Sequence, residues 1–291
     1  MHPLAAALAS LAAATAAVAA PPETVHFPSG DGATELVGYL FRPESADRRA
    51  AVVMLHGRSG PYLSTVKGAC TQVAREAASP CGAATLSGRH RAWGEFWAAR
   101  GYLALHVDSF GPRGKGHGFG RFTHGSPERE DVNERDVRPL DAEGALAWLR
   151  TRADVAPDRI FLQGWSNGGS TVLNTMQRQK RGGAGFRAAL AFYPGCGPKA
   201  LVSASLVSGA PLTVFLGSAD EEVSPTVCRS VLEASRALGS PVDIVWYEDA
   251  EHDFDNPLPR RQGHAANRAA REDSMRRAEA ILGALAPPAA R

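Results

Sequence analysis

The chain has 291 residues, of which 44% are hydrophobic and 21% charged, and its formal net charge at pH 7 is only +2. This composition is typical of a globular protein. The near-neutral charge and the absence of a long basic stretch argue against a nucleic-acid partner.

The first residues look like a targeting segment. Residues 1–19 are dominated by alanine and leucine and end in a small-x-small cleavage pattern at 17–19. The segment is too short and too weakly apolar to predict stable membrane insertion. We therefore expect a signal peptide at 1–19 and a secreted or periplasmic protein, the alternative being an alanine-rich leader that stays attached. The remaining residues, 20–291, are expected to form a single α/β domain.

From there the chain alternates strand-like and helix-like segments. The run at 51–55 is apolar at every position, which suits a central strand of a parallel sheet covered on both faces. Further strands are expected at 25–27, 36–41, 102–107, 160–163, 188–193, 211–217 and 242–248. Helices are expected at 91–100, 136–150, after residue 168, at 224–238 and at 263–285. This alternation predicts a mostly parallel, doubly wound sheet with helices on both faces.

Two segments are longer than such a fold requires. Residues 61–90 form an inserted loop that carries Cys70 and Cys81, and residues 111–127 hold six glycines among several basic residues. Because long loops at the carboxyl edge of such sheets commonly shape the substrate pocket, we expect 111–127 to border it.

The pentapeptide Gly-Trp-Ser-Asn-Gly at 164–168 is the most informative motif. It lies between an apolar strand-like stretch and a segment that can form a helix. In that setting G-x-S-x-G is typical of a nucleophile elbow, a tight turn that holds a serine hydroxyl at the edge of the sheet. The motif predicts Ser166 as a catalytic nucleophile. The alternative is an ordinary glycine-rich connection with a surface serine.

A serine hydroxyl needs a base, usually a histidine that is itself oriented by a carboxylate. Asp220 and His252 each follow a predicted strand, so both are expected at the edge where Ser166 emerges. Their order, acid and then histidine, is the one that accompanies a nucleophile elbow. We therefore predict a Ser166–Asp220–His252 triad. Four other carboxylates compete for the role of acid: Glu221, Glu222, Asp249 and Asp253. In the alternative interpretation, Asp220 caps a helix and His252 is a surface histidine.

The negative charge of a tetrahedral intermediate needs preorganised donors. The backbone N–H groups of Asn167 and Arg58 are the candidates for this oxyanion hole. His56 is expected to pack beneath the site as a structural residue. Two side chains are candidates for substrate contact: Arg113, for an anionic group, and Trp165, beside the nucleophile.

The four cysteines are Cys70, Cys81, Cys196 and Cys228. An even number behind a signal peptide favours disulfides, although buried free thiols are the alternative. No Cys or His pair has the spacing of a zinc site, and the glycine-rich stretch 111–120 lacks the P-loop and dinucleotide-binding patterns, so neither a metal nor a cofactor is expected.

Several separated motifs together resemble the secreted, dienelactone-hydrolase-like branch of the α/β-hydrolase superfamily. They are Gly-Trp-Ser-x-Gly-Gly at 164–169, the stretch 107–114, Phe-Tyr-Pro-Gly-Cys at 192–196 and His-Asp-Phe-Asp at 252–255. The resemblance covers about 50–260 and implies the α/β-hydrolase fold. Founding members use cysteine as the nucleophile, whereas this chain has Ser166, which puts dienelactone itself in doubt as a substrate. In such a sheet the strands at 188–193 and 211–217 are neighbours, so we expect the pairs Cys196–Cys228 and Cys70–Cys81.

The leading hypothesis is a serine hydrolase that cleaves carboxylic esters or lactones through an acyl-enzyme on Ser166. The expected partner is thus a small-molecule ester or lactone. The alternatives are an amide or peptide hydrolase and a non-catalytic binding protein with the same fold. The sequence gives no oligomeric state.

Overall fold

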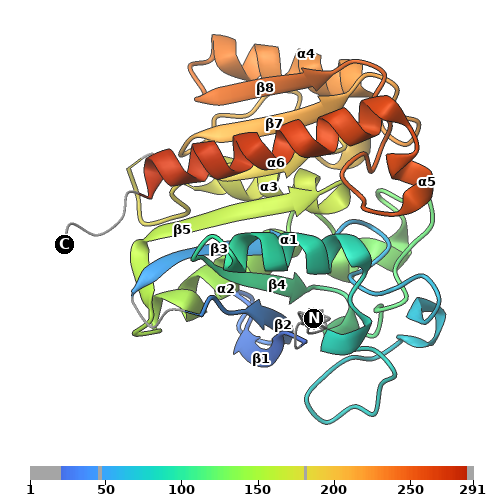
Figure 1. Cartoon of the computed structure of the whole chain (residues 1–291), viewed down its shortest axis with the longest axis vertical. Coiled ribbons are helices and arrows are strands. Elements are labelled where there is room, and N and C mark those ends of the chain that lie inside the picture. Colours follow the sequence, from blue (N-terminus) through green and yellow to red (C-terminus); the bar gives the residue numbers. More distant parts are fainter. Residues whose placement is uncertain (1–20, 45–47, 180–181, 287–291) are drawn as a thin grey trace, which may run out of the picture.

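The computed structural model describes residues 21–44, 48–179 and 182–286 (Figure 1). The expected signal peptide at 1–19 lies outside these residues. The strands form one eight-stranded sheet in the order β1-β2-β4-β3-β5-β6-β7-β8. In the part of the chain that the structure describes, no helix has the length and apolar character needed to cross a membrane.

The sheet is mostly parallel. Its strands are β1 (Glu23–Pro28), β2 (Glu35–Phe41), β3 (Arg49–Leu55), β4 (Leu103–Asp108), β5 (Val155–Trp165), β6 (Ala189–Phe192), β7 (Leu212–Gly217) and β8 (Val242–Tyr247). β1 and β2 form an antiparallel hairpin at one edge, and β2 is antiparallel to β4. From β4 to β8 every neighbouring pair is parallel, so the carboxyl ends of these strands meet at one edge of the sheet.

Helices cover both faces of the sheet. α2 (Arg138–Arg150), α3 (Asn167–Arg178) and α4 (Pro225–Ala237) bury apolar residues in one core. α1 (Gly88–Ala98) and α6 (Ala265–Leu285) pack against the opposite face, in front of the sheet in Figure 1. Residues at helical spacing explain this packing. Trp93 and Trp97 are the buried tryptophans of α1, and Ala270, Ser274, Ala278 and Leu282 lie along the buried face of α6. The predicted α/β-hydrolase architecture is therefore confirmed.

Most element boundaries lie within two residues of the prediction, and the larger differences are at β5, α1 and the closing helix. β5 begins at Val155 rather than at 160, with a register shift against β3 between Arg49 and Ala51. α1 begins at Gly88, because Ser87 is extended and serves as its N-cap residue. The closing helix is divided: a short α5 (Pro259–Gln262) precedes α6, and His264 between them has an extended backbone.

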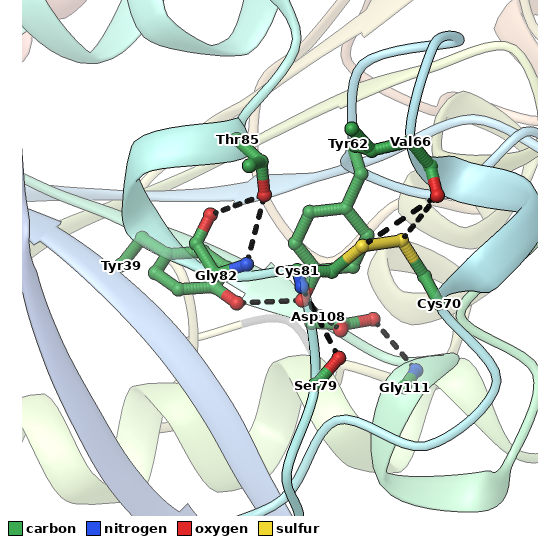
Figure 2. Close-up of a disulfide and its surroundings, with 10 residues drawn as sticks. All are labelled: Tyr39, Tyr62, Val66, Cys70, Ser79, Cys81, Gly82, Thr85, Asp108 and Gly111. Carbon is green, nitrogen blue, oxygen red and sulfur yellow. Dashed lines mark hydrogen bonds between the residues drawn. A yellow bond between two sulfur atoms is a disulfide. The ribbon is translucent and has the colours of Figure 1, made fainter.

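Both expected disulfides are present, joining Cys70 to Cys81 and Cys196 to Cys228. Figure 2 shows the first of them within the 61–90 insertion. Tyr62 of the insertion donates a hydrogen bond of 2.7 Å from its hydroxyl to the buried Asp108, at the end of β4. Tyr39 of β2 lies 2.5 Å from the same tyrosine oxygen. The insertion is thus fixed to the sheet by a buried polar chain as well as closed on itself by a disulfide.

Candidate active site

Ser166 occupies a sharp turn between β5 and α3. Its backbone has φ 53° and ψ −116°, a conformation that is rare for a residue with a side chain. The turn also requires glycine on both sides. A Cβ on Gly164 would lie 2.3 Å from the carbonyl oxygen of Gly168, and a Cβ on Gly168 would lie 2.2 Å from that of Leu55. The expected elbow geometry is present, and it projects the Ser166 hydroxyl from the carboxyl edge of the sheet.

A hydrogen-bonded chain leads from Ser166 to a buried carboxylate. His252 Nε2 is 3.0 Å from Ser166 Oγ, and His252 Nδ1 is 2.8 Å from Asp220 Oδ2. The other Asp220 oxygen accepts hydrogen bonds of 2.8 and 2.9 Å from the backbone N–H groups of Glu222 and Val223. The carboxylate is therefore fixed on both oxygens, and the imidazole between it and the serine is oriented for proton transfer.

The competing acids have other partners. Glu221 pairs with Arg261 and accepts the backbone N–H of His252 at 3.0 Å. Glu222 pairs with Arg58 and Arg121, and one of its oxygens lies 3.8 Å from His252 Nε2. Asp253 contacts Arg89 and Asn256. Asp249 has a left-handed backbone at a turn after β8. Of these carboxylates, only Asp220 reaches His252 Nδ1.

Sequence reasoning missed the electrostatic role of Glu222. Burial acts to raise the pKa of this carboxyl group, but His252, Arg58 and Arg121 outweigh it and lower the pKa below its usual value. Glu222 is thus an ionised carboxylate beside Nε2 of His252. It stabilises a positive charge on His252 without occupying the position that orients the ring.

The candidate oxyanion hole lies beside the serine. Asn167 is the first residue of α3, where a backbone N–H has no acceptor within its own helix. Its side-chain oxygen accepts a hydrogen bond from the buried Arg138, whose other terminal nitrogen donates to the His56 carbonyl at 2.8 Å. Arg138 therefore connects the loop after β3, which carries Arg58, to the start of α3.

His56 is fully buried beneath the site. Its Nδ1 donates to the Gly57 carbonyl oxygen at 2.8 Å, and its Nε2 accepts from the Ser109 N–H at 3.2 Å. Burial, together with the nearby Arg138, holds the pKa of His56 well below its usual value. The ring is neutral and both of its nitrogens are hydrogen-bonded to the backbone, which fits the structural role that the sequence suggested.

Asp255 was not singled out as a site residue, yet it connects the turn that carries Ser166 to the loop that carries His252. It accepts hydrogen bonds of 2.7 and 2.8 Å from the indole N–H groups of Trp93 and Trp165, and one of 2.5 Å from the Tyr193 hydroxyl. Trp165 immediately precedes Ser166, and Asp255 follows His252 in the same loop. The motif at 252–255 was the available signal for this role.

Ser166 lies at the junction of two pockets. We call one the basic pocket: its volume is about 390 Å³ and its wall includes Arg58, Lys67, Arg89, Arg121, Arg260 and Arg261. The other, the apolar pocket, has about 870 Å³ and is lined by side chains such as Phe122, Pro198, Leu201, Val223 and Val227. Arg58, Arg121 and Glu222 line both pockets and so form the boundary between them.

Two candidate contact residues do not line either pocket. Arg113 donates two hydrogen bonds, of 2.9 and 2.8 Å, to the buried Asp141 and another to Asp31. It stands at the start of loop 111–127, and its guanidinium turns toward β1–β2 and α2, so the expected contact with substrate is wrong. Trp165 is fully buried and held by Asp255, so it supports the elbow from below. Loop 111–127 borders the apolar pocket through Arg121, Phe122, His124 and Gly125 instead.

Within the described ranges, no group of three or more His, Cys, Asp or Glu side chains is arranged to hold a metal ion.

The sequence and the structure of this chain were compared with those of known proteins. The model of the dienelactone hydrolase family matches residues 89–285. The esterase 2 of Thermogutta terrifontis, phosphonylated by cyclosarin, is 23% identical and superposes with a TM-score of 0.61, covering 92% of this chain and 96% of its own. The propionate-bound form of the same esterase is 22% identical, with a TM-score of 0.61 and coverage of 93% and 97%. At this identity the structures establish the fold.

Proposed function

The chain belongs to the dienelactone hydrolase family of carboxylic-ester hydrolases, and from that premise we propose that it is a serine esterase or lactonase acting through an acyl-enzyme on Ser166. The observation that carries the proposal is the chain of hydrogen bonds from Ser166 Oγ through His252 to Asp220, with lengths of 3.0 and 2.8 Å. An intact chain of this kind, open to two pockets, also disfavours a purely binding role.

The reaction follows from this geometry. His252 Nε2 accepts the hydroxyl proton while Ser166 Oγ attacks the carbonyl carbon, and Asp220 stabilises the imidazolium that results. The oxyanion accepts hydrogen bonds from the Asn167 and Arg58 N–H groups. When the tetrahedral intermediate collapses, His252 gives its proton to the leaving alcohol. The same histidine then activates water, which releases the acid from Ser166.

The two pockets indicate how an ester is accommodated. Because Ser166 lies between them, the acyl and alcohol halves of an ester occupy one pocket each. An apolar half suits the wall that contains Phe122 and Leu201, and a polar half suits the basic wall. The phosphonylated and propionate-bound forms of the related esterase fit the same reaction class.

We also propose that the protein is secreted or periplasmic and that residues 20–291 form one domain. The support for this location is the pair of disulfides, since such bonds form and persist in oxidising compartments.

The proposal is tested by turnover of a panel of p-nitrophenyl esters and of lactones. We expect wild type to hydrolyse at least one class, and Ser166→Ala and His252→Ala to lose several orders of magnitude of kcat while keeping the circular dichroism spectrum of the wild type. Ser230→Ala, an exposed serine on α4, is the matched control and should keep full activity. Hydrolysis of amides but not of esters would contradict the proposal.

A further inference from the structure

The wall of the apolar pocket contains a histidine that takes no part in the Ser166–His252–Asp220 chain. His124, on loop 111–127, lines this pocket, and 20% of its side chain is exposed. Its Nδ1 is hydrogen-bonded to Glu134 Oε1. No residue of the described chain is a hydrogen-bond partner of the other ring nitrogen, Nε2. The ring is thus anchored on one side and free on the other.

The anchor is built from buried charge. Glu134 is completely buried, and its second oxygen accepts a hydrogen bond of 3.0 Å from Arg129, whose side chain is 1% exposed. Burial acts to raise the pKa of Glu134, but the contacts with His124 and Arg129 lower it on balance. The carboxylate therefore stays ionised, and Arg129 neutralises its charge.

This anchor sets the tautomer of the imidazole. An ionised carboxylate can only accept a hydrogen bond, so Nδ1 of a neutral His124 carries the proton and Nε2 carries the lone pair. Much of the surrounding wall is apolar: Phe122, Leu201, Val223 and Val227. When a ligand fills the pocket and displaces water from Nε2, this acceptor stays satisfied only if the ligand brings a donor.

We propose that His124 is a specificity-determining residue, whose Nε2 accepts a hydrogen bond from a hydroxyl group on the half of the ester that occupies the apolar pocket. The inference rests on the proposed function and adds the substrate class: hydroxylated esters. His124 takes no part in the bond cleavage at Ser166. It discriminates between an ester that carries the hydroxyl and the same ester without it.

The test uses matched ester pairs. One series pairs ethyl esters of ω-hydroxy acids of increasing chain length with ethyl esters of the unsubstituted acids. A second series pairs ω-hydroxyalkyl acetates with alkyl acetates, so that both halves of the ester are examined. For wild type, His124→Leu and His124→Gln, kcat/KM is measured for each member by titrating the acid released. His117→Leu is the control, since His117 is an exposed histidine of the same loop that lines neither pocket.

Wild type is expected to prefer the hydroxylated member in at least one series. His124→Leu should reduce that preference about tenfold, mainly through KM, because one hydrogen bond made equally in the bound and transition states is lost. His124→Gln, which keeps an acceptor, should restore part of the preference, and His117→Leu should not change it.

A wild-type enzyme with no preference in either series would overturn the inference. So would a His124→Leu variant that slows both members of each pair by the same factor, since that is the effect of a purely structural residue. If His124→Leu does not fold, His124→Gln decides the question. Equal kcat/KM values of this variant for the hydroxylated and unsubstituted members of each pair would refute the role. Failure of wild type to cleave any ester would instead refute the proposed function.

Discussion

The choice between carboxylates beside His252 is decided at the scale of single side chains. Asp220 contacts Nδ1, whereas Glu222 lies 3.8 Å from Nε2 and is shared with two arginines. Asp220→Asn should therefore lower kcat by about 10⁴-fold, because the amide disturbs the tautomer of the imidazole. Glu222→Gln should lower it less than about tenfold, because it removes a charge without releasing the ring. Steady-state kinetics of the two variants checks this, and a larger loss in Glu222→Gln would reassign the acid.

Arg113 has a structural role at the same scale. It is the cation that neutralises Asp141, whose side chain is fully buried. Arg113→Ala would leave that carboxylate without its cation, so we expect a loss of about 3–5 kcal/mol in the free energy of unfolding. Arg178→Ala is the control, since it removes an exposed pair with Glu143 and should cost less than about 1 kcal/mol. Urea unfolding measures both, and equal effects would contradict this role.

The sequence predicted the positions of the candidate site residues but not the directions of the long side chains on the loops. The positions of Ser166, Asp220 and His252 follow from strand ends, because parallel strands bring their carboxyl ends to one edge. The direction of a long side chain on a loop depends on distant partners. Nothing near Arg113 in the sequence indicates that Asp141, on a helix 28 positions away, accepts its hydrogen bonds. The same holds for His124, whose partner is Glu134.

At the scale of elements, the 61–90 insertion forms a wall of the basic pocket through Tyr62, Leu63 and Lys67. Its disulfide closes a loop whose ends are 11 positions apart. A Cys70→Ser/Cys81→Ser double variant should lose about 2–4 kcal/mol of stability, because the unfolded chain regains loop entropy. Since the triad lies outside the insertion, KM should rise more than kcat falls. Urea unfolding and kinetics of the variant test this, and unchanged stability together with unchanged KM would refute it.

Elements also show which boundaries a sequence can define. The apolar run of β3 was correctly placed, because a strand buried on both faces leaves an uninterrupted signal. The division between α5 and α6 was missed, because both segments have helical composition. His264 between them has an extended backbone, and Asn267, at the start of α6, donates hydrogen bonds to Glu251 and to the Arg261 carbonyl.

For the whole molecule, three buried histidines predict how stability depends on pH. Burial lowers the pKa of His106 to about 3 and holds the pKa values of His56 and His90 well below their usual value. Below about pH 6.5 the unfolded chain binds a proton at each of these sites and the folded protein does not. The free energy of unfolding should therefore fall with decreasing pH, by up to about 1.4 kcal/mol per pH unit for each histidine.

Carboxylates extend this loss at lower pH. The pKa of Asp31 is lowered to about 2, because hydrogen bonds from Thr34, Ala33 and Arg113 outweigh its partial burial. A carboxyl group with a lowered pKa stabilises the fold above its unfolded pKa of about 4 and loses that contribution as the pH falls toward 2. Asp108, whose pKa burial raises, acts in the opposite direction. Urea midpoints from about pH 7 to about pH 5 measure the histidine contribution, and a flat profile there would contradict it.

The central claim is that Ser166 is the nucleophile, and covalent labelling tests it most directly. Wild-type protein is treated with a fluorophosphonate, digested and analysed by mass spectrometry. The account predicts a single phosphonyl group per chain, attached to Ser166, with no adduct in Ser166→Ala and much slower labelling in His252→Ala. An adduct on another residue, or a Ser166→Ala variant that keeps more than about a tenth of the esterase activity, would contradict it.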